Sequence, residues 1–419
     1  MNELQAIVDA YAETRARGER AALATIVSVV GSAYRRSGAR MLITESAHTV
    51  GTISGGCLER DVIERAAEVM DYGAPRIIEY DTRGNEDIVW GLGLGCNGVV
   101  RILLESLHEE SDGARALEFI AGCLRARQTG IIATVIGATE TSITNSDEAS
   151  EHRIGARLLL VEEQHIINQS LTEDETEDEF IPCLREDAGA VLTGGRSSVR
   201  AYETGAGQIE IFFDLIEPPR SLFVFGAEQD ALPVVRLARA LGWRLTIVDT
   251  RARSRTSERF YEANEVVLCR AEDAASRISL AQDAAAIVMT HNYLDDIELL
   301  RCLLPSQISY LGILGPKQRT AKLLEELSAE GVRLTDAQLA RLHSPIGMDI
   351  GAETPEEIAL SIIAEVKAAF ANRSGGFLRN RNAPIHDEAG APDVAAAEPS
   401  TTSHAILREG KPQVACGLS

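Results

Sequence analysis

The sequence predicts an α/β protein with two domains. Short apolar and β-branched runs alternate with segments of helical periodicity along most of the chain, which is the pattern of layered α/β folds. A length of 419 residues is more than one hydrophobic core usually holds. We expect an N-terminal α/β domain with a mixed sheet over residues 1–217, a C-terminal Rossmann-like domain with a doubly wound parallel sheet over residues 218–372, and a disordered tail over residues 373–419.

The composition excludes several classes of protein. A formal net charge of −22 argues against a general nucleic-acid or anionic-membrane binder. No apolar run approaches the roughly 20 residues that a membrane helix needs, and the start of the chain lacks the pattern of a signal peptide. Seven scattered cysteines, an odd number, fit a reducing compartment better than a disulfide framework. We therefore expect a cytoplasmic protein.

The N-terminal part is expected to alternate helix and strand around glycine-rich loops. Leu4, Ile7, Val8 and Tyr11 share one face of a predicted helix over residues 4–16. Apolar runs rich in β-branched residues predict buried strands. The expected strands are 22–30, 40–44, 76–80, 99–104, 130–136 and 208–215, with a hairpin of 158–161 and 166–167 and a further helix over 114–126.

A glycine-rich turn at residues 51–59 is the first candidate site. Glycines let the backbone turn sharply, and the periodicity downstream predicts a helix that opens near Cys57. The N-terminus of a helix attracts anions and lowers the pKa of a cysteine, so Cys57 is expected to be a thiolate near neutral pH. Ser54 is the expected cap, and Glu59 lies in the first turn. The alternative is a tight connection in which Cys57 is a small buried residue.

A second glycine–cysteine stretch, Gly91-Leu92-Gly93-Leu94-Gly95-Cys96-Asn97-Gly98, precedes the expected strand 99–104. So many glycines cost chain entropy, which predicts a structural or binding reason for them. One cysteine in each of two glycine loops suggests a shared pocket. A tetrahedral zinc site is not suggested, because it needs four close ligands.

Two adjacent arginines, Arg35 and Arg36, follow the expected strand 22–30. Paired guanidinium groups beside glycine can clamp a phosphate. Together with Arg40 they would supply a local basic pocket in an acidic protein. The alternative is a solvated pair on the surface.

The C-terminal domain begins after Glu217-Pro218-Pro219 with a strand, a glycine turn, a helix and a second strand. Gly226 occupies the first position of a dinucleotide-binding fingerprint, and Asp249 lies 23 positions later, where an acid can hold a ribose hydroxyl. Glu228 replaces the second glycine, and its carboxylate disfavours ordinary NAD(P) binding. His291 follows a later strand on the ligand-binding edge, as a candidate ligand or proton-transfer group, or as a merely polar loop residue.

Four motifs follow one another in an order that resembles a known family. They are Gly31-Ser32-Ala33-Tyr34-Arg35-Arg36, Gly38-Ala39-Arg40-Met41, Gly51-Thr52-Ile53-Ser54-Gly55-Gly56-Cys57-Leu58-Glu59 and Gly91-Leu92-Gly93-Leu94-Gly95-Cys96. Together they resemble the xanthine dehydrogenase accessory protein family (XdhC/CoxI), and the resemblance continues to about Phe370.

The resemblance implies a factor that binds molybdenum cofactor, supports its sulfuration and inserts it into a xanthine-dehydrogenase-like or CO-dehydrogenase-like enzyme. It favours an accessory protein over an enzyme, with the apo-molybdoenzyme and a cysteine desulfurase as partners and a homodimer as the assembly. In this hypothesis Cys57 and Cys96 contact the metal, Gly55 and Gly56 give backbone donors, and Arg35 and Arg36 hold the phosphate, with Ser54, Glu59 and Gly95 in the same site.

Two alternatives use different parts of the chain. One is an NAD(P)-dependent oxidoreductase with Gly226, Asp249 and His291 at its site. The other is a docking chaperone that holds an apo-enzyme and binds no small molecule.

Overall fold

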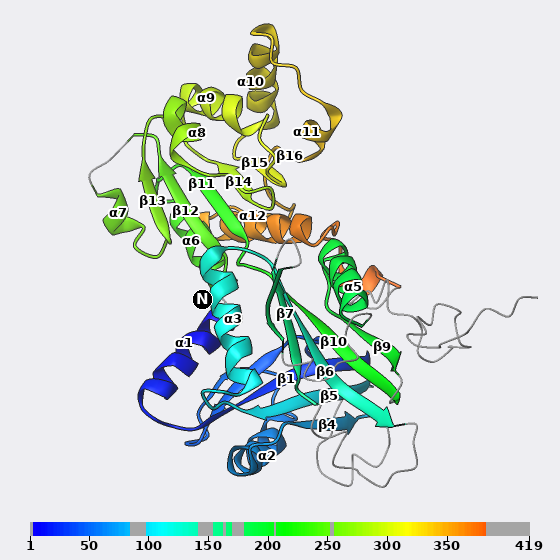
Figure 1. The fold of residues 1–419 in the computed structure, drawn as a ribbon. Helices are drawn as coiled ribbons and strands as arrows, with labels where there is room; N and C mark the ends of the chain where they lie inside the picture. The colour runs from blue at the N-terminus through cyan, green and yellow to red at the C-terminus, as the bar shows by residue number, and fades with distance from the viewer. Residues whose placement is uncertain are drawn as a thin grey trace, which may run out of the picture. The chain divides into compact units, whose positions relative to one another are not determined.

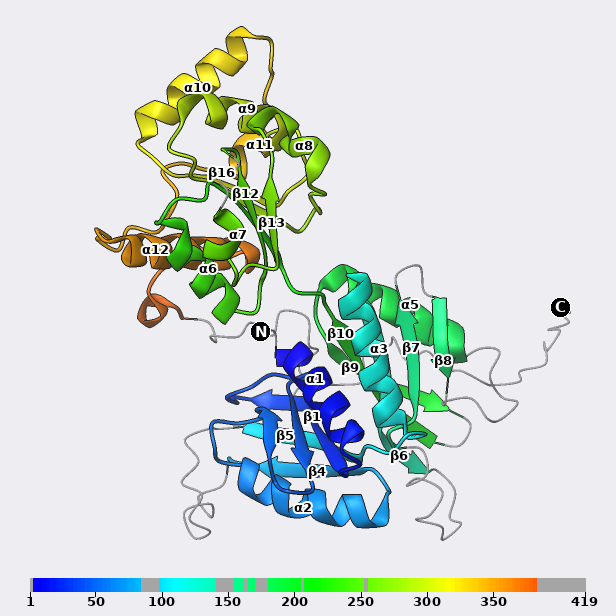
Figure 2. The ribbon, with the colours of Figure 1, turned by 90° about the vertical axis from the view of Figure 1, so that its left-hand side faces the viewer.

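The computed structural model describes residues 3–83, 98–140, 154–161, 165–169, 180–204, 207–251 and 255–382. They form two compact units, one over residues 3–218 and one from residue 219 onward. Figure 1 and Figure 2 show sheets and helices in both units, so the predicted α/β class is confirmed.

The first sheet of the N-terminal unit has the strand order β3-β2-β1-β5-β4, and every pairing in it is antiparallel. Apolar residues of β1 alternate between two clusters, so both faces of the sheet are covered. Helix α2 packs on one face, and α1 and α3 pack on the other. The elements are α1 (Glu3–Ala16), β1 (Ala21–Gly31), β2 (Arg40–Thr44), β3 (Thr49–Gly51), α2 (Glu59–Tyr72), β4 (Arg76–Asp81), β5 (Gly98–Ser106) and α3 (Asp112–Ala126).

The second sheet has the order β8-β7-β6-β10-β9 and is also antiparallel wherever pairings are described. The expected hairpin is present as β7 and β8. A mixed sheet was expected, but short connections favour antiparallel neighbours, since a parallel pair needs a longer crossover. Helix α5 covers one face of this sheet. The elements are β6 (Gly130–Glu140), β7 (Arg157–Val161), β8 (His165–Gln169), α5 (Phe180–Gly194), β9 (Ser198–Thr204) and β10 (Gly207–Ile216).

Arginine–carboxylate pairs join the two N-terminal sheets. The Arg157 guanidinium on β7 binds Glu105 on β5 through two contacts of 2.8 and 2.6 Å, and both side chains are buried. Arg101 on β5 reaches Glu210 on β10 at 2.7 Å. Arg40 on β2 pairs with Asp214 on β10. The sheets are therefore linked by ion pairs as well as by apolar packing.

The C-terminal unit is a parallel sheet of order β13-β12-β11-β14-β15-β16. Helices α6 and α12 pack on one face, and α9 and α10 on the other (Figure 1), so the doubly wound prediction is confirmed. The elements are β11 (Ser221–Phe225), α6 (Ala231–Ala240), β12 (Arg244–Asp249), α7 (Thr256–Arg259), β13 (Glu265–Leu268), η3 (Ala271–Asp273), α8 (Ala274–Arg277), β14 (Ala285–Val288), α9 (Tyr293–Leu303), β15 (Tyr310–Ile313), α10 (Lys317–Ala329), α11 (Asp336–Ala340), β16 (Leu342–His343), α12 (Pro355–Phe370) and η4 (Leu378–Asn380).

The strand order places a topological switch point between β11 and β14. The connections on either side of this point run to opposite faces of the sheet, and ligands of such folds bind beside it, at the carboxyl ends of the strands. Gly226 follows β11 and His291 follows the end of β14, so both residues lie at this edge.

Candidate functional site

Two loops of the N-terminal unit meet at the glycine turn. A Cβ atom added to Gly55 would lie 3.6 Å from ring carbons of Tyr34, so the ring of Tyr34 packs against the turn. Glu3 joins the same loops, because one of its carboxylate oxygens accepts the Thr52 N–H at 3.1 Å and the other pairs with Arg35. The sequence did not indicate Tyr34 or Glu3 as organising residues, since their role depends on the pairing of distant segments.

Glu59 stabilises the glycine turn through hydrogen bonds to its carboxylate. Its carboxylate accepts the N–H of Ser54 at 2.7 Å, the hydroxyl of Ser54 and the N–H of Gly56 at 3.0 Å. Burial by itself would raise the pKa of Glu59, but these hydrogen bonds outweigh it and keep the pKa below its usual value. The Ser54 hydroxyl oxygen in turn accepts the N–H of Leu58 at 3.0 Å. Ser54 and Glu59 therefore serve the shape of the turn.

The middle of the turn, at Gly55, Gly56 and Cys57, is exposed to solvent. Gly56 has a φ of 104°, which favours glycine. Its N–H is used by Glu59, whereas the N–H groups of Gly55 and Cys57 have no hydrogen-bond partner among the residues that the structure describes. Helix α2 begins at Glu59, so Cys57 precedes the helix by two positions instead of opening it. The alternative of a buried cysteine is wrong, because Cys57 is exposed.

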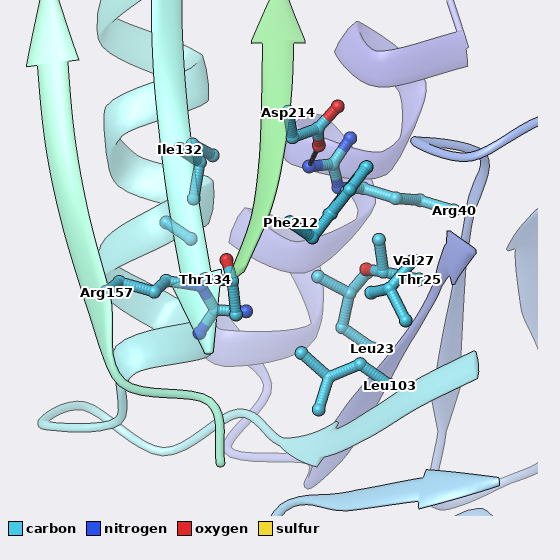
Figure 3. A pocket seen from close by; sticks show the side chains of 11 residues that line it. Leu23, Thr25, Val27, Arg40, Leu103, Ile132, Thr134, Arg157, Phe212 and Asp214 are labelled. Atoms are coloured by element: carbon cyan, nitrogen blue, oxygen red, sulfur yellow. Dashed lines mark hydrogen bonds and ion pairs between the residues drawn. The ribbon is translucent and has the colours of Figure 1, made fainter. Parts of the chain in front are cut away.

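The three arginines of the expected basic pocket have different roles. Arg40 is buried and its guanidinium is directed at Asp214 (Figure 3), so it does not belong to a surface pocket and that expectation is wrong. Arg35 lies near the turn but is engaged by Glu3. Arg36 is exposed beside it. The second glycine–cysteine stretch, with Gly95 and Cys96, lies outside the described residues.

The pocket in Figure 3 lies between the two N-terminal sheets. Leu23, Val27 and Phe212 form its apolar wall, and the ends of Arg40 and Arg157 reach it from opposite sides. Both guanidinium groups are engaged by buried carboxylates. We therefore interpret this pocket as part of the packed interface between the two sheets and not as a second binding site.

Gly226 and Asp249 perform structural tasks at the edge of the C-terminal sheet. A Cβ atom at Gly226 would lie 2.3 Å from the carbonyl oxygen of Met289, so the close approach of the two loops needs glycine. Asp249 is buried, and its carboxylate accepts the N–H of Arg251 at 2.9 Å and the hydroxyl of Thr256 at 2.6 Å. Both oxygens of Asp249 thus hold the loop after β12.

His291 forms a pair that the sequence did not predict. Its Nε2 atom lies 2.7 Å from a carboxylate oxygen of Asp230, the residue before α6. His291 has a φ of 57°, in the left-handed region that few residues other than glycine adopt. The imidazole is half exposed, so Asp230 orients a side chain that a ligand can reach. The signal in the sequence was the acid beside the fingerprint turn, but only the fold brings it to His291.

No group of three or more histidine, cysteine and acidic side chains in the described ranges is arranged to hold a metal ion. Among the helices that the structure describes, none has the length and apolarity to cross a membrane.

Comparison with known proteins places the chain in a family. The profile described as "XdhC and CoxI family" matches residues 14–81, and the profile "XdhC Rossmann domain" matches residues 222–366. The chain is 31% identical to a probable xanthine dehydrogenase subunit of Bacillus subtilis (strain 168), over 87% of this chain and 97% of that protein. It is 22% identical to the molybdenum cofactor insertion chaperone PaoD of Escherichia coli (strain K12), over 83% of each chain.

A solved structure supports the same assignment. The crystal structure of a xanthine dehydrogenase from Bacillus halodurans superimposes with a TM-score of 0.67 at 27% identity, and the match covers 89% of this chain and 97% of that one. The two profile matches cover the first three of the four N-terminal motifs, up to Glu59, and most of the parallel-sheet unit. The fourth motif, at residues 91–96, lies outside both matches. The chain therefore belongs to the XdhC and CoxI family.

Proposed function

We propose that this protein is a maturation factor that carries molybdenum cofactor as cargo and delivers it to a xanthine-dehydrogenase-like or CO-dehydrogenase-like enzyme. The observation that carries the proposal is the exposed turn that presents the Cys57 thiol beside the N–H groups of Gly55 and Cys57, for which the described part of the chain supplies no acceptor. The relative named as a molybdenum cofactor insertion chaperone supports the same role.

The chemistry of the turn suits the metal end of this cargo. The cofactor is a pterin that holds its metal through two sulfur atoms and bears a phosphate. A thiolate is a soft ligand that suits molybdenum or a sulfur relay. The N–H groups of Gly55 and Cys57 can donate to anionic oxygens, while Gly56 and Glu59 keep the turn in shape. Cys96 remains a proposed second contact to the metal.

The phosphate end of the cargo is assigned to Arg36 and Arg35. Arg36 is exposed in the loop that Tyr34 fastens to the turn. Arg35 would first have to leave Glu3, because its guanidinium is already paired there. We therefore expect Arg35 to contribute to phosphate binding only once it is released from Glu3.

The proposed partners follow from the cargo. Insertion requires an apo-molybdoenzyme, and sulfuration requires a persulfide donor, for which we propose a cysteine desulfurase. We propose that the protein acts in the cytoplasm as a homodimer, and that it is a carrier and not an enzyme. Its formal net charge of −22 disfavours binding to nucleic acid or to anionic membranes.

The NAD(P)-dependent oxidoreductase is the weaker candidate. His291 and Asp230 would supply its proton-transfer pair. However, Asp249 is buried and uses both oxygens for the loop after β12, so it does not offer them to a ribose. Glu228 adds a carboxylate where a pyrophosphate would approach the backbone. A docking chaperone without cargo remains the other outcome of the test below.

The test is anaerobic incubation of the full-length protein with molybdenum cofactor, followed by gel filtration. Retained molybdenum and pterin fluorescence are measured for the wild type, for Cys57→Ala and for Cys302→Ala. Cys302 is a half-buried free cysteine on α9 and serves as the matched control. We expect stoichiometric retention by the wild type and the control, and a loss of at least about tenfold in affinity for Cys57→Ala.

Two outcomes would contradict the proposal. No retention by the wild type would remove the carrier function and leave the docking chaperone. Full retention by Cys57→Ala would preserve the carrier but exclude Cys57 from its site.

A further inference from the structure

Arg259 is a half-buried cation at the carboxyl edge of the C-terminal sheet. Its guanidinium donates to the carbonyl oxygen of Ala227 at 3.0 Å. It forms no ion pair with any carboxylate in the part of the chain that the structure describes. In a chain with 63 acidic and 41 basic residues, a partly buried arginine with no carboxylate partner among the described residues is a candidate ligand for an external anion.

The position of Arg259 identifies where that anion would lie. Ala227 directly follows Gly226, in the turn between β11 and α6 at the switch point of the sheet. Folds of this topology bind phosphate groups of nucleotides at this turn. Glu228 stands where such folds use a second glycine to bring backbone N–H groups to the phosphate. The Arg259 guanidinium, which is hydrogen-bonded to the same turn, offers a substitute for those donors.

Arg251 is a second cation at the same edge. It follows β12, and its guanidinium lies 3.8 Å from Glu228 and 4.0 Å from Asp295. These are long ion pairs, and the Arg251 side chain is 43% exposed. Exposed pairs of this kind contribute little free energy, so a ligand anion can compete for Arg251.

We propose that this edge binds a nucleoside phosphate whose phosphoryl oxygens are held by Arg259 and Arg251. Guanidinium groups bind phosphate through paired, charge-assisted hydrogen bonds, so the side chains replace the backbone contacts that Glu228 prevents. Asp249 has no part in ribose recognition, because its carboxylate is used internally. The site lies in the C-terminal unit and does not depend on the cofactor site proposed for the glycine turn at Cys57.

Substitutions at Glu228 and at Arg259 are expected to change the affinity for the ligand in opposite directions. The Glu228 carboxylate repels a phosphate and also holds Arg251, so removal of its charge strengthens binding. Removal of the Arg259 charge weakens binding. A merely structural defect would not move the two variants in opposite directions.

The experiment is isothermal titration of the full-length protein with ADP and, separately, with inorganic phosphate. We expect Arg259→Gln to weaken ADP binding about tenfold and Glu228→Gln to strengthen it about threefold. Arg244 and Glu265 form a comparable pair at 3.9 Å, with side chains 39% and 51% exposed, at the start of β12 and β13. Because they lie at the opposite edge of the sheet, Arg244→Gln and Glu265→Gln should leave ADP binding unchanged.

Four results would overturn the proposal. The first is absence of ADP binding by the wild type at about 1 mM ligand. The second is wild-type affinity in Arg259→Gln, and the third is weaker binding in Glu228→Gln. Equal affinity for inorganic phosphate and ADP would exclude the nucleoside part.

Thermal unfolding of each variant checks its fold. If Arg259→Gln fails to fold, Arg251→Gln takes its place, with the same expected direction. Retention of molybdenum cofactor is measured in parallel, so failure of this site is distinguished from failure of the cofactor site.

Discussion

Glu59 is the residue that sets the shape of the exposed turn. Its carboxylate accepts hydrogen bonds from Ser54 and Gly56, and these bonds favour the ionised form. The pKa of Glu59 in the folded protein therefore lies below its value in the unfolded chain. Since Ser54 and Gly56 flank Gly55, the charge on Glu59 is coupled to the donors that Gly55 and Cys57 present.

The lowered pKa of Glu59 predicts how stability depends on pH. A carboxyl group with a depressed folded-state pKa contributes stability above its unfolded pKa, and this contribution is lost as the pH falls through the folded pKa. We expect the wild type to lose this part of its free energy of unfolding below about pH 4.3, and Glu59→Gln to lack it at neutral pH. Urea unfolding of both proteins at pH 7 and at successively lower pH values measures the difference. Parallel curves for the two proteins would contradict the assignment.

Helices α11 and α12 of the C-terminal unit both begin with a capping box, but only α12 has buried side chains. Thr354 and Glu357 cap α12, and its buried residues include Ile362 and Val366. Thr335 and Gln338 cap α11, which has no buried residue. The same local motif therefore supports a core element in one case and a surface turn in the other.

This contrast predicts unequal costs for the same substitution. Thr354→Ala should lower the free energy of unfolding by about 1 kcal/mol, which is typical of a lost N-cap. Thr335→Ala should lower it by less than about 0.5 kcal/mol, because α11 can fray without opening the core. Urea denaturation followed by circular dichroism gives both values. Equal effects would show that capping strength does not depend on what each helix buries.

Ion pairs between the two N-terminal sheets contribute to the stability of the whole N-terminal unit. Arg40 on β2 and Asp214 on β10 come from segments far apart in the sequence, and both side chains are almost fully buried. A buried pair is costly to break because the remaining charge loses its partner in a medium that solvates it poorly.

Removal of one member of this pair should be severe, and removal of both should be milder. Arg40→Met alone is expected to cost about 3–5 kcal/mol of unfolding free energy, and Arg40→Met with Asp214→Leu should recover most of it. Arg60→Met serves as a control, because Arg60 and Glu64 form an exposed pair on α2, and its effect should stay within about 0.5 kcal/mol. Chemical denaturation of the three variants tests the prediction. A double variant as unstable as Arg40→Met would contradict it.

Local patterns were enough for the elements whose residues specify their own conformation. The run that became β11 and the expected hairpin of β7 and β8 were both predicted. The edge strands β3 and β16 were missed, because they are three and two residues long and only pairing defines them. The start of α2 was displaced from Cys57 to Glu59, because Glu59 binds the preceding turn.

The candidate sites show the same division. Residue types at short spacing were sufficient to predict the family, the alternation of elements and the glycine turn with Cys57. Tertiary packing was needed to establish that Arg40 belongs to the core, that Glu3 holds Arg35, and that His291 meets Asp230. Partners separated by 174, 32 and 61 positions leave no local signal, since the burial and contact that fix the role of a charge exist only after distant segments pack.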